Sequence, residues 1–258
     1  MTAQTTPSAA EDLRARVLQA AQGEPAPTRA VQTRRRVGLV AGGFAVTALL
    51  ALMKHAADRR ALAAPAAGSG RRIWHVVAAG AAPARPLGYV ATLELVWLLV
   101  AASATWMGVM RGRSMLGRSG ASKIAVAVAT PVALIATWFV IAYAWLPAVL
   151  PLAWLEAMDD APDFHFDAAC ALSSVVYAAG PLLAFFAMRR RRDPVSPRRA
   201  GAALGAVAGA WGAVVHFPFC QCTSPLHMAA GHVLPVVCLA LMGALLGDRV
   251  LGVRAATA

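Results

Sequence analysis

The stretch His216-Phe-Pro-Phe-Cys-Gln-Cys-Thr-Ser-Pro-Leu-His227 holds two of the chain's four cysteines and two of its six histidines. Cys220 and Cys222 are separated by one residue. His216 lies four residues before Cys220, and His227 lies five residues after Cys222. Thiolate and imidazole are ligands that zinc, copper and cadmium ions accept. The four side chains are therefore candidate metal ligands. The single intervening residue is shorter than the cysteine spacing of structural zinc sites, so a turn shaped by the two prolines, in which the thiols only pack, stays open.

The other two cysteines differ in their surroundings. Cys238 lies in the apolar run Val-Val-Cys-Leu-Ala, where a free cysteine usually packs as a small apolar side chain. Cys170 is expected at the same depth and in the same compartment as Cys220 and Cys222. A disulfide from Cys170 to either of them would close a loop of about 50 residues and be less strained than a bond between Cys220 and Cys222. The spacing leaves metal binding and disulfide formation both open.

Two further ionisable residues lie near or inside apolar segments. His232 follows His227 by five residues, which on an α-helix offsets the two rings by about 140°. We therefore expect His232 to hydrogen-bond at a helix interface and not to share a ligand with His227. Glu94, in Ala-Thr-Leu-Glu-Leu-Val-Trp, is the one ionisable group well inside a predicted span. A carboxylate at that depth is costly, which makes a transport or relay role a hypothesis for it.

Membrane helices must position these residues, because 59% of the 258 residues are apolar and only 14% are charged, against about 25% charged in soluble domains. A helix needs about 20 apolar residues to cross the hydrocarbon core. Six segments meet this requirement: 37–53, 88–110, 124–146, 168–188, 200–217 and 229–247. The sequence predicts an all-α, polytopic bundle of six transmembrane helices over 37–253, preceded by a polar segment, 1–36.

Lysine and arginine residues collect before the first span and in the loops after the second and fourth spans. The loop after the third span is acidic, and the cysteine-rich loop is uncharged. Because cytoplasmic loops carry the excess of cations, both termini are expected in the cytoplasm and the cysteines outside it. The cationic connection 54–87 is the exception. The net charge of +12 sits at helix ends without interleaved aromatic residues, so no direct nucleic-acid binding is expected.

The polar segment 1–36 contains one short helical pattern. Leu13, Val17, Leu18 and Ala21 form an apolar stripe, preceded by a capping-box pair, Ser8 and Glu11. A helix of this length is marginal alone in water and would be stabilised by docking onto a partner. A solvated tail without a partner is the alternative.

Glycine spacing and loop composition are similar to those of a known family. Gly201, Gly205 and Gly209, with Gly243 and Gly247 in the last span, predict that these two spans pack together. A cysteine opening the fourth span, this glycine-rich fifth span, the His and Cys in the next loop and the final Leu-Met-Gly-Ala-Leu-Leu-Gly-Asp-Arg-Val-Leu resemble the NrsF family, negative regulators of sigma F. Pro27-Thr-Arg29 before the arginine cluster is similar to the way that family approaches its first helix. The resemblance covers 168–251 in detail and 1–165 in topology.

The resemblance implies a non-enzymatic anti-sigma factor in the bacterial inner membrane. The cytoplasmic segment, with candidate contacts Leu13, Val17, Leu18, Pro27 and Arg29, would hold an extracytoplasmic-function sigma factor inactive. Periplasmic cysteines would sense metal or redox stress and release it. The family's two cysteines map onto Cys170 and onto Cys220 or Cys222, and the extra cysteine leaves the pairing open. No cofactor is required, although a zinc, copper or cadmium ion could occupy the loop.

Two other functions fit parts of the pattern. A membrane thiol oxidoreductase would need a cycling pair, but the chain has no Cys-x-x-Cys. A metal transporter would use Glu94 as an intramembrane ligand and the Cys/His loop as a filter. Six spans without inverted repeats argue against a transporter.

Overall fold

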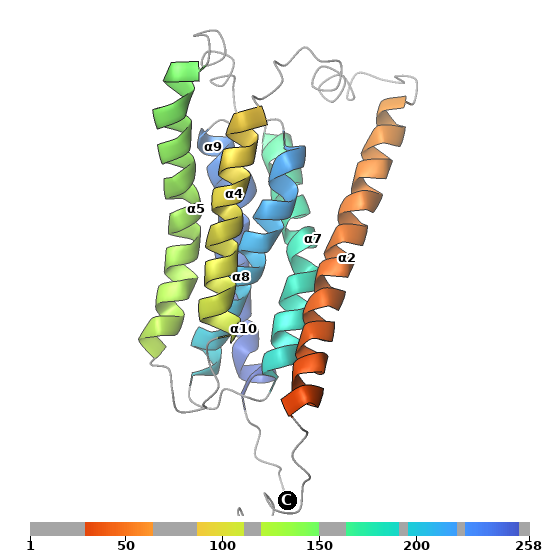
Figure 1. Ribbon diagram of the computed structural model, residues 1–258, viewed down its shortest axis with the longest axis vertical. Helices are drawn as coiled ribbons and strands as arrows, with labels where there is room; N and C mark the ends of the chain where they lie inside the picture. The colour runs from red at the N-terminus through yellow and green to blue at the C-terminus, as the bar shows by residue number, and fades with distance from the viewer. Residues whose placement is uncertain are drawn as a thin grey trace, which may run out of the picture. The chain divides into compact units, whose positions relative to one another are not determined.

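The computed structural model describes residues 29–63, 87–110, 120–149, 164–190, 196–220 and 225–252. Every regular element in these ranges is a helix, and six helices are long and apolar enough to cross a membrane. They are α2 (Arg29–Ala63), α4 (Leu87–Thr105), α5 (Gly120–Val149), α7 (Phe164–Arg189), α8 (Pro197–His216) and α10 (Leu234–Val250) (Figure 1). The predicted all-α bundle with six membrane-spanning helices is confirmed.

The helix bounds differ from the predicted spans, most in α2, and two of the helices adjoin π-helical turns. α2 begins at Arg29 rather than at 37, because arginine favours helical backbone and Arg34–Arg36 limit only the apolar part of the helix. α4 continues into a π-helical turn, η2 (Trp106–Met110), and α10 is preceded by a second one, η4 (Met228–Val233). Residues Leu39–Ala258 form one compact unit and Met1–Gly38 another. The packing described below is that of the larger unit.

α8 lies at the centre of this unit and contacts α4, α5, α7 and α10. Its buried positions are mostly alanine and glycine, which let neighbouring backbones approach closely. Toward α10, Gly201 faces the backbone of Gly243, and three similar contacts follow the helix pair. These join Gly205 to Leu239, Gly209 to Val236 and Gly247 to Pro197. The predicted packing of the fifth and sixth spans is confirmed.

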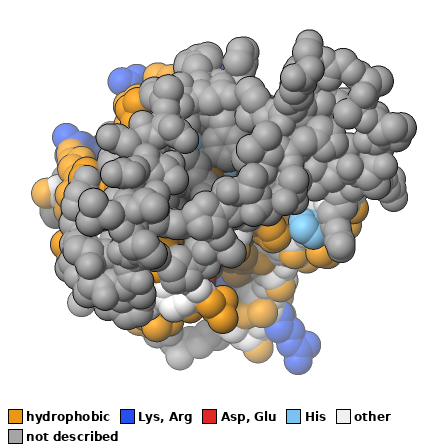
Figure 2. Space-filling view, turned by 90° about the horizontal axis from the view of Figure 1, so that it is seen from above, with side chains coloured by type: hydrophobic (Ala, Val, Ile, Leu, Met, Phe, Trp, Pro, Cys, Tyr) orange, Lys and Arg blue, Asp and Glu red, His pale blue; other side chains and the backbone are white. Residues whose placement is uncertain are grey.

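The outward faces of the helices are apolar. Figure 2, a view from one end, shows mostly hydrophobic side chains where described residues are visible at the rim, with a few Lys, Arg and His side chains among them. Exposed large apolar residues occur on every membrane-spanning helix except the buried α8; they include Leu52, Leu99, Val140, Leu183, Leu241 and Leu245. Such a surface matches a lipid environment and would be unfavourable in water.

The two ends of the unit differ in chemistry. At one end, which we call the cation-rich end, Arg198 pairs with Asp248, the Lys123 ammonium donates to Ser196 Oγ at 2.8 Å, and Arg189 donates to the Val109 carbonyl. The opposite, thiol end has Cys170 near the start of α7 and Cys220 just after α8. α2 runs from the cation-rich end to the thiol end, because Gly43 lies against Gly180 whereas His55 contacts Phe219.

Candidate metal centre

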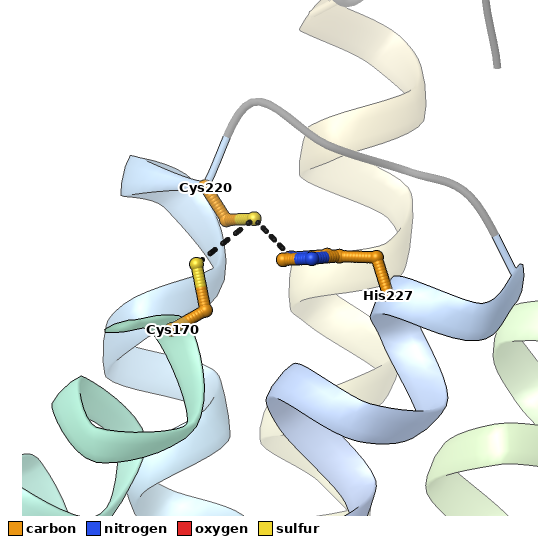
Figure 3. A group of neighbouring side chains, drawn as sticks. All are labelled: Cys170, Cys220 and His227. Atoms are coloured by element: carbon orange, nitrogen blue, oxygen red, sulfur yellow. Dashed lines mark hydrogen bonds between the residues drawn. The ribbon is translucent and has the colours of Figure 1, made fainter. Parts of the chain in front are cut away.

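Three ligand-bearing side chains from separate segments meet at the thiol end (Figure 3). The Cys170 and Cys220 sulfurs are 4.0 Å apart, and Cys220 Sγ lies 3.0 Å from His227 Nε2. All three ligand atoms lie within 4.8 Å of one another, and all three residues are buried. We call Cys170, Cys220 and His227 the thiol–imidazole cluster.

Local sequence places Cys220 in this cluster. α8 ends at His216 and continues as a single 3-10 turn, η3 (Phe217–Phe219), which contains Pro218. The backbone becomes extended at Cys220, whose N–H donates to the Phe217 carbonyl at 3.1 Å. This turn directs the thiol to Cys170 on α7, as Figure 3 shows.

A π-helix places His227 beside His232. The prediction that these residues would face different directions is wrong, because their ring centroids are 5.5 Å apart in a T-shaped contact. The expected 140° offset assumed α-helical pitch, whereas η4 begins directly after His227. A π-helix pairs residue i with residue i+5, so a five-residue spacing returns to the same side of the helix.

The predicted metal ligands divide between three places. Cys220 and His227 are in the cluster. His216 lies outside it, with its ring stacked on His232 at 5.3 Å and near Tyr177 at 5.7 Å. Cys222 falls outside the described residues.

The remaining predicted residues lie elsewhere. Cys238 is an exposed free thiol on α10, and Glu94 is half-buried on α4. Leu13, Val17, Leu18 and Pro27 fall outside the described residues, and Arg29 opens α2.

Sequence reasoning missed the residues that support the cluster. Gly231 forms its floor, since a Cβ there would lie 3.2 Å from both Cys170 Cβ and His227 Cε1. Ser174 Oγ donates to the Gly231 carbonyl at 3.2 Å and so joins α7 to η4. Neither residue carries a sequence signal for this role, because their contact depends on the π-helical register of η4.

Comparison with known proteins assigns the chain to a family. Residues 52–252 match NrsF, negative regulator of sigma F. The chain belongs to the NrsF family. No curated protein and no solved structure matches it. Membership identifies the chain as a negative regulator of a sigma factor, that is, an anti-sigma factor, and its six apolar helices indicate a multi-pass membrane protein.

The matched range of this NrsF chain contains the whole cluster, whose spacing suits a metal ion. Two thiolates on a tetrahedral zinc ion are about 3.8 Å apart, and a thiolate and an imidazole about 3.6 Å apart. The observed 4.0 Å between sulfurs fits the first value, and the 3.0 Å between Cys220 Sγ and His227 Nε2 would have to open slightly. A disulfide would require the sulfurs to approach by about 2 Å.

Protonation opposes metal entry. Cys220 follows the spanning segment Pro197–Phe219. Its hydrogen bond with the Cys170 thiol and its burial raise the pKa of the Cys220 thiol well above its ordinary value, and His227 counteracts this only in part. The thiol is therefore protonated at neutral pH, and a bound metal must displace the proton.

Proposed function

We propose that this NrsF protein is a metal-responsive anti-sigma factor of the bacterial inner membrane. The cytoplasmic segment 1–36 binds a sigma factor of the extracytoplasmic-function class. The thiol–imidazole cluster binds a thiophilic metal ion from the periplasm, and binding releases the sigma factor. The observation that carries this proposal is the convergence of Cys170, Cys220 and His227 from three chain segments into one buried site.

Charge distribution supports this orientation. Arg189, Arg198 and Lys123 make contacts at the cation-rich end, opposite the cluster. Cations flank membrane spans preferentially on the cytoplasmic side, so the cluster would face the periplasm. Within the larger unit α2 runs from the cation-rich end to the thiol end, as a cytoplasmic N-terminal segment requires.

The composition of the cluster favours metal over disulfide as the stimulus. The sulfurs have the separation of two zinc ligands, and the imidazole of His227 adds a third ligand that a disulfide would not use. Three ligands leave a fourth coordination position for water or another side chain. Disulfide formation also needs an external oxidant to accept two electrons, whereas metal binding needs only the release of protons.

The test uses full-length protein in detergent, co-purified with a candidate sigma factor and titrated with cadmium. Wild type should release the sigma factor, whereas Cys170→Ser and Cys220→Ser should retain it. Cys238→Ser is the matched control, because it removes an exposed thiol outside the cluster, and it should behave as wild type. Retention of the sigma factor by metal-treated wild type would overturn the proposal. Release by diamide in the presence of chelator, with a Cys170–Cys220 bond on non-reducing gels, would replace metal by oxidation.

The sigma-binding role of the N-terminal segment has its own test. The double variant Leu13→Ala, Arg29→Ala should lose co-purification with the sigma factor while its membrane insertion stays unchanged. Gln4→Ala, in the same segment but outside the apolar stripe, is the control and should still bind. Equal sigma binding by both variants would place the binding surface elsewhere.

A further inference from the structure

Two hydrogen bonds tie α7 to other helices. Pro181, inside α7, has no N–H to donate to the Tyr177 carbonyl four residues earlier, and Thr47 Oγ1 of α2 donates to that carbonyl at 2.8 Å. The second bond joins Ser174 Oγ of α7 to the Gly231 carbonyl in the π-helical turn η4. Because hydrocarbon offers no alternative donors, these bonds hold α7 to α2 on one side and to η4 on the other.

The contact between α2 and α7 is close at this point. A Cβ on Gly43 would lie 2.7 Å from the Gly180 carbonyl oxygen and 2.8 Å from Ala184 Cβ. Thr47, one turn further along α2, is only 1% exposed. We call Gly43, Thr47, Tyr177 and Gly180 the α2–α7 contact. At this contact the two backbones touch and a hydroxyl–carbonyl bond fixes their register, so α2 should follow a displacement of α7.

α8 and α10 form a second closely packed pair. Four glycine contacts join their backbones, from Gly247 against Pro197 at the cation-rich end to Gly209 against Val236 nearer the thiol end. Side chains cannot rearrange between backbones in direct contact, so these two helices should move together. Cys220 and His227 lie at the thiol end of this pair.

The thiol–imidazole cluster joins α7 to the α8–α10 pair, and α7 also packs directly on α8, where a Cβ on Gly212 would overlap the Ser174 carbonyl oxygen. Cys170 belongs to α7, which is tied to α2, whereas Cys220 and His227 belong to the α8–α10 pair. Metal entry must open the 3.0 Å distance between Cys220 and His227 by about 0.6 Å. The His227 ring is packed on Gly231, whose carbonyl is bonded to Ser174 of α7, so the displacement reaches α7 directly.

We propose that the α2–α7 contact transmits metal occupancy of the cluster to α2 and thereby to the sigma-binding segment that α2 joins to the membrane. Tyr177 lies seven residues, or about 10 Å, along α7 from Cys170. Ser174 lies between them, so the cluster and the α2–α7 contact are about two turns apart on the same helix. The inference rests on the proposed function, because it names the route by which that function would be regulated.

The test substitutes Thr47 and measures metal binding and sigma binding separately on full-length protein. Thr47→Val removes the hydroxyl with little change in volume, and Thr47→Ser retains it. Thr130→Val is the matched control: Thr130 is equally buried, but its hydroxyl donates to Val126 in its own helix. Cadmium titration measures the metal affinity of the cluster. The ratio of the sigma affinities with and without cadmium measures the coupling between the two sites.

In wild type, cadmium should lower sigma affinity by about 5- to 150-fold, the usual range of coupling between sites. Thr47→Val should bind cadmium and metal-free sigma factor as wild type does, but its cadmium effect should fall below about threefold. Thr47→Ser and Thr130→Val should keep the wild-type effect. Two results for Thr47→Val would overturn this inference: an unchanged effect of cadmium on sigma affinity, or a loss of cadmium binding. Either result would leave the proposed function standing. No cadmium effect in wild type would overturn the proposed function itself.

Discussion

At Cys220 a thiol is held between a second thiol and an imidazole, in a site closed to solvent. Each partner has a different effect, because Cys170 favours the protonated thiol and His227 favours the thiolate. The balance lies with the thiol, so Cys220 carries no charge in the absence of metal. This arrangement keeps an uncompensated charge out of the buried site. The Cys220 thiol would ionise only when a metal binds and displaces its proton.

The raised pKa of the Cys220 thiol predicts pH-dependent metal affinity. Below that pKa the proton competes with the metal, so cadmium affinity should rise about tenfold per pH unit for each thiol proton displaced. Above the pKa the dependence should flatten. Cys220→Ser should lower the affinity by more than the roughly 10- to 100-fold typical of a residue behind the ligands. Titration of purified protein at several pH values, followed by cadmium–thiolate ultraviolet absorption, checks both. A pH-independent affinity would exclude displaced thiol protons.

At the scale of helices, hydrophobic length and glycine spacing were sufficient to predict the six spans and the α8–α10 packing. They could not predict the facing of His227 and His232, because apolar periodicity does not distinguish a π-helical turn from an α-helical one in so short a segment. The sequence does predict that Cys170 lies near Cys220, because Cys170 is near the start of α7, on the side of the membrane where α8 ends. His216 joins His232 instead of the thiols, because its position on α8 precedes the 3-10 turn that redirects the chain.

The π-helical turn η4 predicts the effect of removing one residue. Deleting Ala230 should restore α-helical pitch and rotate everything before it by about 100° relative to α10. His227 would then leave the cluster. Cadmium affinity should fall as far as in His227→Ala, while α10 keeps its contact with α8. Cadmium titration of the two variants provides the comparison, with Ala230→Ser as the control of unchanged length. Wild-type affinity in the deletion would show that η4 does not position His227.

The α8–α10 contact predicts a stability difference between two glycines. In Gly205→Val the new side chain would overlap the Leu239 backbone and should destabilise the protein by about 1–3 kcal/mol or more, as overpacking does. Gly42→Val is the control, because nothing lies within 4 Å of a Cβ at Gly42, and it should be tolerated. Thermal unfolding in detergent measures both. Equal melting temperatures would mean that α8 and α10 can separate at little cost.

On the scale of the whole molecule, a signal must pass between two chemically different ends. The cation-rich end gathers contacts from α4, α5, α7, α8 and α10, and the thiol end gathers the cluster. α7 has a residue in both sets, Cys170 near one end and Arg189 at the other. A sensor at one membrane face and a sigma-binding segment at the other require such an element. The proposed function therefore requires that the thiol end of the bundle faces the periplasm and the cation-rich end faces the cytoplasm.

That orientation can be measured with reporters at two positions. Because cations flank spans on the cytoplasmic side, a fluorescent protein fused after Ala258 should fluoresce, and alkaline phosphatase fused there should be inactive. Alkaline phosphatase inserted in the acidic connection 150–163 should be active, because this connection precedes α7, whose first turns carry Cys170 of the cluster. A fusion at position 4 is the control, because an even number of spans requires it to behave as the C-terminal fusion does. The reversed pattern would put the thiols in the reducing cytoplasm, where the cluster could not report on the periplasm.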